Sequence, residues 1–485
     1  MRRRAVAGVA ALVGTLLPTL VWAPPGAATS SRVKTASNPV SRAYFAHLRI
    51  RLVTDSDWAS VQLSPGTILR ARLSAPAGSH AWRVGGHGFG VAGGPGAGRQ
   101  QATLDVLYTN FDRRAPVRIQ LTKGDIGAAR VTAWRVSGDD AVRIGRLRDA
   151  LHATPHRSTF ERQLTLSRQS AMGLRSTALP SVDPRRLVLA FYYPWYAGYR
   201  SPALADRPRD ARSTDTARGV ASLTRQAKRA GVNGFVVSWH GSASDGHHFR
   251  LALEAARRYH QLVTGYLETP AAMSTESVAR RLVFPGEQVL SWLVQLLDYS
   301  RNRAFLHSHG VPVVFVYQMS ALSPAGWRQA LHLLRVRYHR RVHLVGDSTD
   351  PAYLPFEWGV HRYAATEPAG QLTRVAVDAS LLAKGGAVLD GARPRLYAAT
   401  VSPGFDDRRV PGRHDRVVSR RHGARYRETW RAARAARADW VLVTSWNEWY
   451  EDTEIEPGRL TGARALRQTR HFTRQWERKS APGAG

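Results

Sequence analysis

The chain has 485 residues, which allows two or three domains, and it contains no cysteine. Disulfides, thiolate metal sites, cysteine nucleophiles and lipoprotein anchoring are therefore excluded. The formal net charge is +34, because 70 lysine and arginine residues outnumber 36 aspartate and glutamate residues. These cations are spread along the whole chain without any nucleic-acid-binding motif, so we expect a solvated basic surface and no specific nucleic acid partner. Loose association with an anionic cell envelope is the alternative.

The amino-terminal segment has the pattern of a secretory signal peptide. Three arginines follow Met1, an apolar stretch runs to about Trp22, and small residues lead to Ala28. We expect cleavage after Ala28 and a secreted, extracellular protein, with a retained membrane anchor as the alternative. Residues 29–43 are rich in serine and threonine and predict a flexible lead-in. No second apolar run approaches ~20 residues, so we expect a soluble mature protein, and we expect it to be a monomer.

Residues 44–136 predict a small β-sandwich-like domain. Five segments alternate apolar and polar side chains with a period of two, and turn residues separate them, including a glycine-rich stretch at 85–98. The five segments are Leu48–Val53, Ile68–Leu73, Thr103–Tyr108, Val117–Leu121 and Val131–Val136. We expect residues 137–184 to form a connector with some helix around Arg143–Leu151.

Residues 185–478 alternate apolar strands with amphipathic helices. The predicted strands are 187–193, 234–239, 263–268, 312–317, 342–345, 358–363, 396–401 and 440–445. About eight strand–helix units in this length predict an α/β fold of the (β/α)8 TIM barrel type. An open doubly wound sheet is the alternative, but it would more usually carry a phosphate-binding loop after its first strand.

The last predicted strand runs into a segment of acids and aromatics, with five carboxylates between Glu448 and Glu456. In a barrel of this kind, function lies at the carboxyl ends of the strands. Glu448 and Glu451 are the candidate catalytic pair, because glycoside hydrolysis needs one carboxyl to protonate the leaving oxygen and a second to assist at the sugar. A calcium loop or a plain acidic surface is the alternative. The segment lacks the glycine and acid spacing of the common calcium loop, so we expect no metal.

The ends of the other predicted strands carry side chains suited to sugars. Aromatic rings stack on the apolar faces of sugar rings, while amides and acids bind hydroxyl groups. The candidate substrate-binding residues are Tyr193, Trp195, Tyr196, Trp239, His240, Glu268, Tyr317, Asn447, Trp449 and Tyr450. Any one of these aromatics could instead pack the barrel rim. The agreement of six strand ends favours a polysaccharide or oligosaccharide site.

Four segments resemble glycoside hydrolase family 99, the endo-α-mannosidases, or the broader family-99-like group. They are Phe191–Tyr196, Gly231–Gly241, Ser402–Asp407 and Ser445–Pro457, and the last is the most specific. The resemblance implies a (β/α)8 barrel that cleaves internal α-mannosidic linkages with retention and without a metal or cofactor. It also implies that Glu448 deprotonates the sugar 2-hydroxyl to give a 1,2-anhydro sugar, and that Glu451 acts as acid and then as base.

The chain departs from the family pattern at five positions in these segments. They are His240, Trp446, Tyr450, Asp452 and Glu454. No catalytic carboxylate is lost, so we expect a secreted retaining endo-acting glycoside hydrolase. Two other classes compete with this expectation. One is a non-catalytic glycan-binding or polysaccharide-assembly protein on the same barrel, and the other is a basic secreted protein that binds polyanions.

Overall fold

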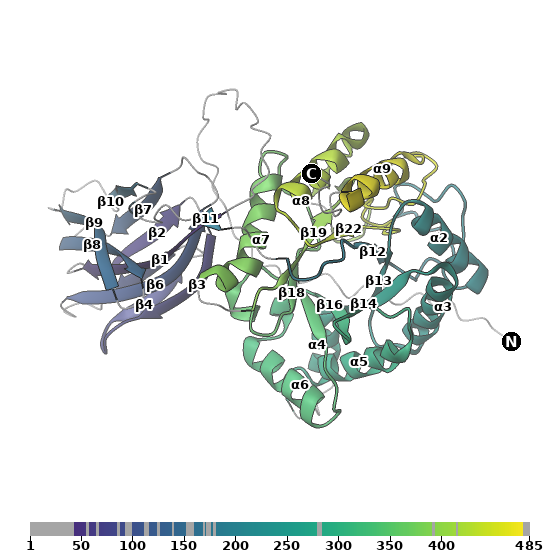
Figure 1. Ribbon diagram of the computed structural model, residues 1–485, viewed down its shortest axis with the longest axis horizontal. Helices are drawn as coiled ribbons and strands as arrows, with labels where there is room; N and C mark the ends of the chain where they lie inside the picture. The colour runs from purple at the N-terminus through teal and green to yellow at the C-terminus, as the bar shows by residue number, and fades with distance from the viewer. Residues whose placement is uncertain are drawn as a thin grey trace, which may run out of the picture.

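The computed structural model describes residues 43–54, 58–64, 67–84, 88–92, 99–110, 116–123, 127–137, 140–151, 160–167, 170, 176–177, 181–278, 284–389, 393–413 and 416–478. The predicted signal peptide lies outside the described residues, as does the lead-in apart from Ala43. Two domains lie side by side: an all-β domain first and a barrel second (Figure 1). No helix in the described part of the chain is both long enough and apolar enough to cross a membrane.

The first domain is a sandwich of two antiparallel sheets around one core. One sheet has the order β3-β6-β1-β8-β9, with β11 beside β1, and the other has the order β10-β7-β2-β5-β4. Its strands are β1 (Ala43–Thr54), β2 (Trp58–Ser64), β3 (Thr67–Ser74), β4 (His80–Val84), β5 (Gly88–Ala92), β6 (Gln100–Asn110), β7 (Val117–Lys123), β8 (Gly127–Ser137), β9 (Asp140–Leu151), β10 (Phe160–Leu166) and β11 (Ser176–Thr177). Ile50 and Leu52 of one sheet and Val61 and Ile119 of the other are fully buried between them. The predicted sandwich is therefore present.

The sandwich extends beyond the residues from which it was predicted. The helix expected around Arg143–Leu151 is wrong, because β9 occupies this segment and pairs antiparallel with β8. The alternation of exposed Arg146 and Arg148 with Leu147, which packs on the core, suits a strand better than a helix. The glycine-rich stretch also contains a strand, β5. There Gly90 allows the Trp82 ring to lie directly over the backbone, since a Cβ atom at this position would meet the ring.

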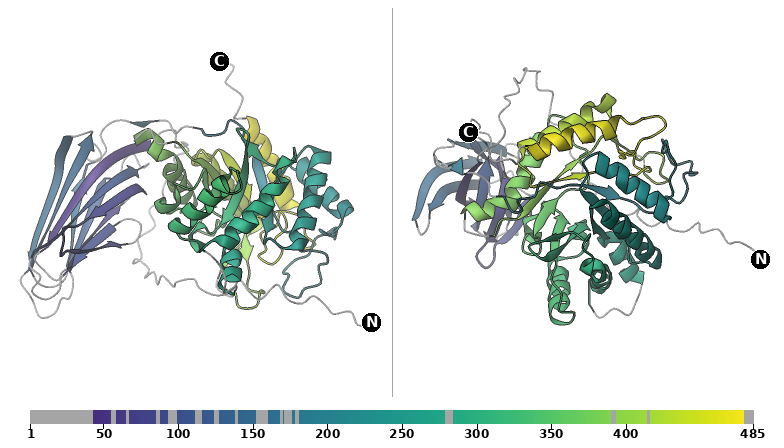
Figure 2. Two further views of the ribbon diagram at one scale, coloured as in Figure 1. Left: turned by 90° about the horizontal axis from the view of Figure 1, so that it is seen from below. Right: turned by 45° about the vertical axis from the view of Figure 1, so that its right-hand side comes forward.

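The second domain is a closed barrel of eight parallel strands, as the sequence predicts. They are β12 (Val188–Tyr192), β13 (Gly234–Trp239), β14 (Leu262–Glu268), β16 (Val311–Tyr317), β17 (His343–Asp347), β18 (Gly359–His361), β19 (Leu396–Val401) and β22 (Trp440–Val443). Each pairs in parallel with its neighbours, and the pairing of β14 with β16 closes the ring. Figure 2 shows the helices around this ring. The open doubly wound alternative is thereby excluded.

Helices cover the outside of the barrel between successive strands. They are α2 (Ala217–Arg229), α3 (Ala243–Tyr259), α4 (Thr269–Val278), α5 (Glu287–Leu297), α6 (Pro324–Val336), α7 (Leu372–Leu389), α8 (Ala424–Ala435) and α9 (Arg464–Arg478). Single 3-10 turns occur at Asp298–Arg301, Met319–Ala321, Pro351–Tyr353 and Arg421–Gly423. The short strands β15 (His307–Ser308), β20 (Phe405–Asp406) and β21 (Val417–Val418) form hairpins at the edges of the barrel.

Strand residues divide between two cores according to the pleat of the sheet. Leu189, Phe191 and Val236 face the barrel interior, together with Tyr266 and Phe315. Their sequence neighbours, such as Ala190 and Val237, pack instead against the surrounding helices. Because successive side chains of a strand point to opposite faces, the same alternation decides which residues at the strand ends face the site.

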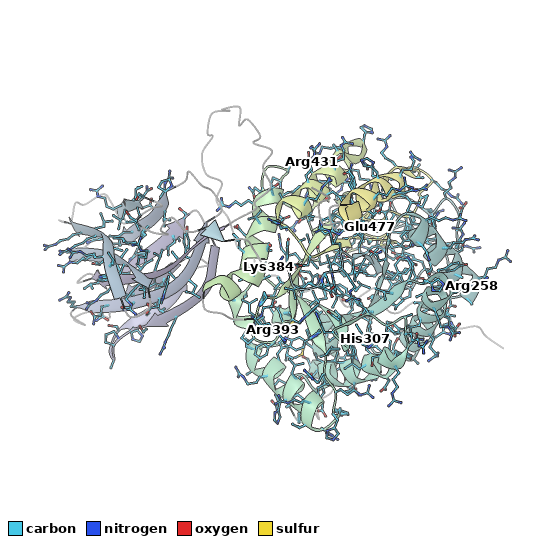
Figure 3. The ribbon with its side chains drawn as sticks, viewed as in Figure 1. Arg258, His307, Lys384, Arg393, Arg431 and Glu477 are labelled. Atoms are coloured by element: carbon cyan, nitrogen blue, oxygen red, sulfur yellow. The ribbon has the colours of Figure 1, made fainter. Side chains whose placement is uncertain are left out.

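Two contacts fix the helix α7 between the domains. On its barrel side, Lys384 is buried and pairs with Asp439 at 3.0 Å, directly before β22 (Figure 3). Asp439 also accepts a hydrogen bond from the Tyr397 amide at 2.9 Å, which ties the start of β22 to β19. On its other side α7 contacts β1, β3 and β6 of the sandwich, and Leu107 of β6 joins the core of the barrel domain. The sandwich thus docks through α7 onto the barrel wall.

Candidate active site

The segment after β22 folds back on itself over the carboxyl end of the barrel. Backbone hydrogen bonds join the Ser445 amide to the Thr453 carbonyl at 2.8 Å and the Ile455 amide to the Ser445 carbonyl at 3.0 Å. The Ser445 hydroxyl accepts a bond from the Glu448 amide at 2.7 Å. Glu448 and Glu451 therefore lie on an irregular loop rather than on a helical turn. This loop is held closed, so both side chains have defined positions.

Glu448 is buried, with 5% of its surface exposed. Its Oε1 atom accepts a hydrogen bond from the Tyr196 hydroxyl at 2.7 Å and another from the Tyr450 amide at 3.2 Å. Burial, and after it the nearby charge of Glu451, raises the pKa of Glu448 to about 8. The surroundings of Glu448 therefore favour the protonated carboxyl in the unliganded protein.

Glu451 has different partners on its two oxygens. Its Oε2 atom accepts from the Tyr363 hydroxyl at 2.9 Å, and its Oε1 atom pairs with the Arg413 guanidinium at 3.0 Å. Burial raises the pKa of Glu451, while Arg413 and the Tyr363 hydroxyl act in the opposite direction because they stabilise the anion. Two carboxyls three residues apart in sequence thus sit in unlike electrostatic surroundings.

Tyr193, directly after the first barrel strand, is hydrogen-bonded to Tyr363, the tyrosine partner of Glu451. The Tyr193 hydroxyl donates to the Tyr363 hydroxyl at 2.7 Å. Asn447 holds the backbone of Tyr193 from both sides, because its Oδ1 atom accepts from the Tyr193 amide and its Nδ2 atom donates to the Tyr193 carbonyl, both at 2.8 Å. Asn447 is fully buried, so its role is to position Tyr193 rather than to bind a sugar.

Glu268, at the end of β14, is a third carboxyl at the same end of the barrel. It accepts a hydrogen bond from the Ser238 hydroxyl at 2.6 Å. Burial raises its pKa, and the charge of Glu451 acts in the same direction, which places the two acids near each other. Tyr317 lies at the next strand end, and burial followed by the charges of Glu451 and Glu268 raises its pKa. The predicted residues Glu268 and Tyr317 therefore share the site with the acid pair.

Three predicted substrate-binding residues keep open surface beside the acids. Trp195 is 43% exposed, and its ring centroid lies 4.8 Å from that of Tyr193 and 6.0 Å from that of His240. Tyr450 is half-buried and stacks on Tyr196 at 5.7 Å. Trp195, His240 and Tyr450 can therefore contact a ligand. Tyr193 and Tyr196 are nearly fully buried and act instead through their hydroxyl groups.

Trp239 and Trp449 do not fit the predicted contact with a sugar. Trp239 is 2% exposed, packs edge-on against Phe249 and donates through its indole nitrogen to the Trp292 carbonyl at 3.2 Å. It faces the helices because Ser238, its neighbour on the strand, faces the barrel interior. Trp449 is 1% exposed and donates to the buried Glu456 carboxyl at 3.3 Å. Both residues belong to the core.

The remaining acids of the segment stabilise the loop. Arg420 is half-buried among them and donates to the Glu454 carboxylate at 2.5 Å, to the Asp452 carboxylate at 3.3 Å and to the Asp452 carbonyl at 2.9 Å. Glu456 is 3% exposed, and burial raises its pKa to about 8. Asp452, Glu454 and Glu456 therefore surround the loop and do not open toward the acid pair. Among the described residues no group of three His, Cys, Asp or Glu side chains is arranged to hold a metal ion.

Four residues of the site were not predicted from the sequence: Ser238, Asp347, Tyr363 and Arg413. Tyr363 lies two residues beyond β18, and its amide donates to the Asp347 carboxylate at 3.1 Å. Burial raises the pKa of Asp347 to about 6. Ser238 belongs to the group because it donates to Glu268, and Arg413 belongs to it because it pairs with Glu451. Strand alternation points to Ser238, and the position at the end of the predicted strand 358–363 points to Tyr363, but Arg413 lies on a loop with no signal of its own.

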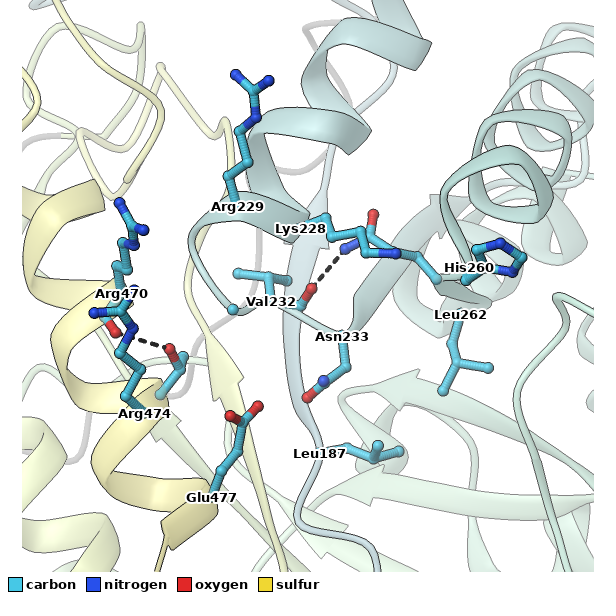
Figure 4. Close-up of a pocket in the computed structure, with 13 residues that line it drawn as sticks. Leu187, Lys228, Arg229, Val232, Asn233, His260, Leu262, Arg470, Arg474 and Glu477 are labelled. Atoms are coloured by element: carbon cyan, nitrogen blue, oxygen red, sulfur yellow. Dashed lines mark hydrogen bonds between the residues drawn. The ribbon is translucent and has the colours of Figure 1, made fainter.

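A pocket of about 460 Å³ lies at the other end of the barrel. Its lining includes Leu187, Asn233 and Leu262, at the amino ends of the first three barrel strands, and residues of α2 and α9. Several cations surround it, but Lys228 and Arg229 leave α2 in different directions (Figure 4). The Lys228 ammonium group donates to the Tyr259 carbonyl. This pocket is therefore separate from the acid pair.

No family model matches the chain, and no curated protein is similar to it in sequence. Among solved structures, it is similar to a GH99 endo-alpha-mannosidase from Bacteroides thetaiotaomicron, with 21% identity, a TM-score of 0.49, and coverage of 60% of this chain and 98% of that chain. A glycoside hydrolase-like protein matches with 16% identity, a TM-score of 0.47, and coverage of 61% and 97%. A GH5_18 protein from Streptomyces cattleya, in complex with GlcNAc, matches with 14% identity, a TM-score of 0.39, and coverage of 62% and 82%.

A GH99 endo-alpha-mannosidase is thus among the solved structures to which the chain is similar. The barrel itself follows from the strand pairing of this chain.

Proposed function

We propose that the protein is a retaining, endo-acting glycoside hydrolase that cleaves α-mannosidic or related linkages. One observation carries the proposal: Glu448 and Glu451 sit in unlike electrostatic surroundings at the carboxyl end of the barrel, because Glu448 accepts from the Tyr196 hydroxyl whereas Glu451 accepts from the Tyr363 hydroxyl and pairs with Arg413. Glycosidic cleavage needs two carboxyls whose proton affinities differ. The exposed Trp195 ring supports a sugar ligand beside them.

The proposed reaction takes place in two steps. Glu448 removes the proton of a sugar 2-hydroxyl, and that oxygen attacks the anomeric carbon to form a 1,2-anhydro sugar. At the same time Glu451 gives its proton to the departing glycosidic oxygen. In the second step Glu451 takes a proton from water, the water oxygen attacks the anomeric carbon, and the 2-oxygen recovers a proton from Glu448. Two displacements at the same carbon retain its configuration.

The proton affinities in the unliganded protein run opposite to these roles, because burial favours the protonated form of Glu448 while Arg413 favours the anion of Glu451. We propose that substrate binding separates Arg413 from Glu451 and that the proton then moves from Glu448 to Glu451. Arg413 is suited to this movement, since its side chain is 34% exposed whereas that of Glu451 is 14% exposed. The two acids would thus share one proton and exchange it when the substrate enters.

The ion pair between Arg413 and Glu451 also favours a second candidate, a non-catalytic glycan-binding protein. In that case the acids would bind sugar hydroxyls and Arg413 would keep Glu451 ionised throughout. The distinguishing experiment incubates the full protein with α-mannans of several linkages and with other neutral glycans, and follows new reducing ends and product lengths. Internal cleavage supports the hydrolase, and binding without turnover across the panel supports the second candidate.

Secretion remains part of the proposal. The arginines after Met1 and the apolar stretch that follows support export. An extracellular position would bring the barrel into contact with polymeric glycans. Amino-terminal sequencing of protein recovered from the culture medium tests it, and a mature chain that begins after Ala28 is the expected result.

A further inference from the structure

The outer face of the first sandwich sheet carries a concentration of arginines. Buried residues such as Ile50 and Leu52 point into the core, so the alternating residues of the same strands point outward. Six arginines of β1, β8 and β9 share this outward face, which we call the arginine face: Arg49, Arg51, Arg130, Arg143, Arg146 and Arg148. Five of them are exposed, and Arg130, in the middle, is half-buried.

Strand register places these arginines in neighbouring rows. Arg51 lies opposite Thr132, which lies opposite Arg146. Arg130 lies opposite Arg148 in the next row. Rows on one face are about 7 Å apart, and adjacent strands are about 4.8 Å apart. The charges therefore cover an area that a single small anion could not span.

Few opposing charges balance this face. Asp105 pairs with Arg49 at 2.9 Å and is the only carboxylate among the described side chains of these rows. The charge of Arg146, then burial, and then the charges of Arg148, Arg99 and Arg51 lower the pKa of Arg130. Like charges held this close repel one another, and an anionic ligand would relieve the repulsion.

We propose that the arginine face binds an acidic polysaccharide. A chain with repeated carboxylate or phosphate groups can contact successive rows at once. Trp134 lies between Arg49 and Arg143 in the third row and is half-buried, so it offers an aromatic surface to a sugar ring within the charged area. Duplex nucleic acid would match the charge, but its stacked bases leave no free face for Trp134, so the ring and the arginines together suit a charged sugar chain better.

The position of the face suits a polymer that extends beyond the barrel. The sandwich docks on α7 through the end of the sheet that holds Leu107, whereas β8 and β9 lie at the far side of the domain (Figure 1). This face would hold the protein on an acidic polymer while the barrel acts on a glycan. The choice of a polysaccharide rests on the proposed function, although the charge pattern itself does not.

The test measures binding of the full protein, with Glu451→Gln in all samples to prevent cleavage, to polygalacturonate. Replacing Arg51, Arg143, Arg146 and Arg148 with Gln removes four charges of the arginine face. The matched control replaces four exposed arginines of α2 and α3, namely Arg218, Arg225, Arg229 and Arg257. We expect the first variant to bind roughly tenfold more weakly and the control to change less than twofold, with the difference shrinking at high salt.

Equal losses in the two variants would overturn the proposal, because they would show that net charge alone attracts the polymer. Tighter binding to phosphatidylglycerol vesicles or to duplex DNA than to polygalacturonate, with the same dependence on the arginine face, would also overturn it. If the fourfold variant does not fold, Arg146→Gln with Arg148→Gln serves instead. Hydrolysis of neutral mannan by protein with Glu451 intact is measured in parallel, so failure of the proposed function is seen separately.

Discussion

Tyr363 donates its phenolic hydrogen to Oε2 of Glu451 across 2.9 Å, from a strand end 88 residues earlier in the chain. The backbone of Tyr363 is itself fixed on two sides, since its amide donates to Asp347 and its carbonyl accepts from the Thr444 hydroxyl at 2.9 Å. The barrel therefore holds Glu451 through three strand ends, those of β17, β18 and β22. Although Glu451 lies on a loop, these bonds fix the position of its carboxyl and influence its proton affinity.

Loss of the Tyr363 hydroxyl should slow turnover without unfolding the protein. Tyr363→Phe removes a hydrogen bond to a carboxylate, worth about 1.5–3 kcal/mol, so we expect kcat to fall roughly 10- to 100-fold. Tyr426→Phe is the matched control, because it removes a buried tyrosine bond of 3.0 Å to Thr469 between α8 and α9. The interpretation fails if both variants lose the same activity at the same melting temperature.

Arg413→Gln should identify which acid donates the proton. Arg413 lowers the pKa of Glu451, so its removal raises that pKa. Because the two acids share one proton, both limbs of the pH–rate profile belong to the pair, and the height of the maximum between them distinguishes the roles. If Glu451 must be protonated, raising its pKa moves the shared proton toward it and the maximal kcat/KM rises. If Glu451 must be ionised, the maximal kcat/KM falls. We expect a rise; a fall would reverse the roles.

Glu448→Gln should stabilise the protein at alkaline pH. The folded protein raises the pKa of Glu448 from 4.5 to about 8, so it binds this proton more tightly than the unfolded chain does. The resulting stability is fully present below pH 4.5 and is lost as the pH rises toward 8. The Gln variant carries no such loss and keeps an oxygen for Tyr196 and the Tyr450 amide. Its melting temperature relative to the unmodified protein should therefore increase between pH 5 and pH 8.

The control for this pH dependence is Glu254→Gln, which removes an exposed carboxyl of α3. We expect its melting temperature to follow that of the unmodified protein across the same range. A constant difference between Glu448→Gln and the unmodified protein at pH 5 and pH 8 would show that folding does not change the proton affinity of Glu448.

Trp195 and Trp239 should respond in opposite ways to substitution. Trp195→Ala removes an exposed ring that a sugar can stack on, worth about 0.5–1.5 kcal/mol, so we expect KM to rise roughly 2- to 13-fold with little change in melting temperature. Trp239→Phe removes a buried indole bond to the Trp292 carbonyl, so it should lower the free energy of unfolding by about 1–3 kcal/mol and leave KM nearly unchanged. Substrate titration and thermal melts of both variants distinguish the two roles.

Strand patterns in the sequence were sufficient to predict the barrel and the acid pair. Eight apolar strands, most of them separated by enough chain for a helix, leave few other folds, and Glu448 and Glu451 follow the last of them directly. Which face of its strand each aromatic side chain occupies depends on the pleat, and the sequence did not settle it. Trp239 was therefore predicted to line the site, although Ser238, its neighbour, is the residue that faces the barrel interior. The segment Arg143–Leu151, predicted to contain helix, is part of β9, and its two-residue alternation is interrupted by the extra residue Ile144, which lies opposite Ala133 and Trp134 of β8.

Arg413 shows the limit of what the sequence could predict. It lies between β20 and β21, and nothing in its neighbourhood distinguishes it from the other arginines of a chain with a net charge of +34. Only the hairpin that brings residue 413 back over the barrel places it on Glu451. Glu451 was predictable from a motif. The effect of Arg413 on the proton affinity of Glu451 depends on tertiary structure and was not.

The most direct test of the account is the release of oligosaccharides from α-mannan by the unmodified protein and by Glu448→Gln and Glu451→Gln. Each substitution preserves side-chain shape and removes the proton transfer, so we expect release to fall by about 10²–10⁴-fold in both variants, with circular dichroism spectra unchanged. Products of the unmodified protein should first appear with retained anomeric configuration. Undiminished release by either folded variant would contradict the assignment of Glu448 and Glu451 as the catalytic pair.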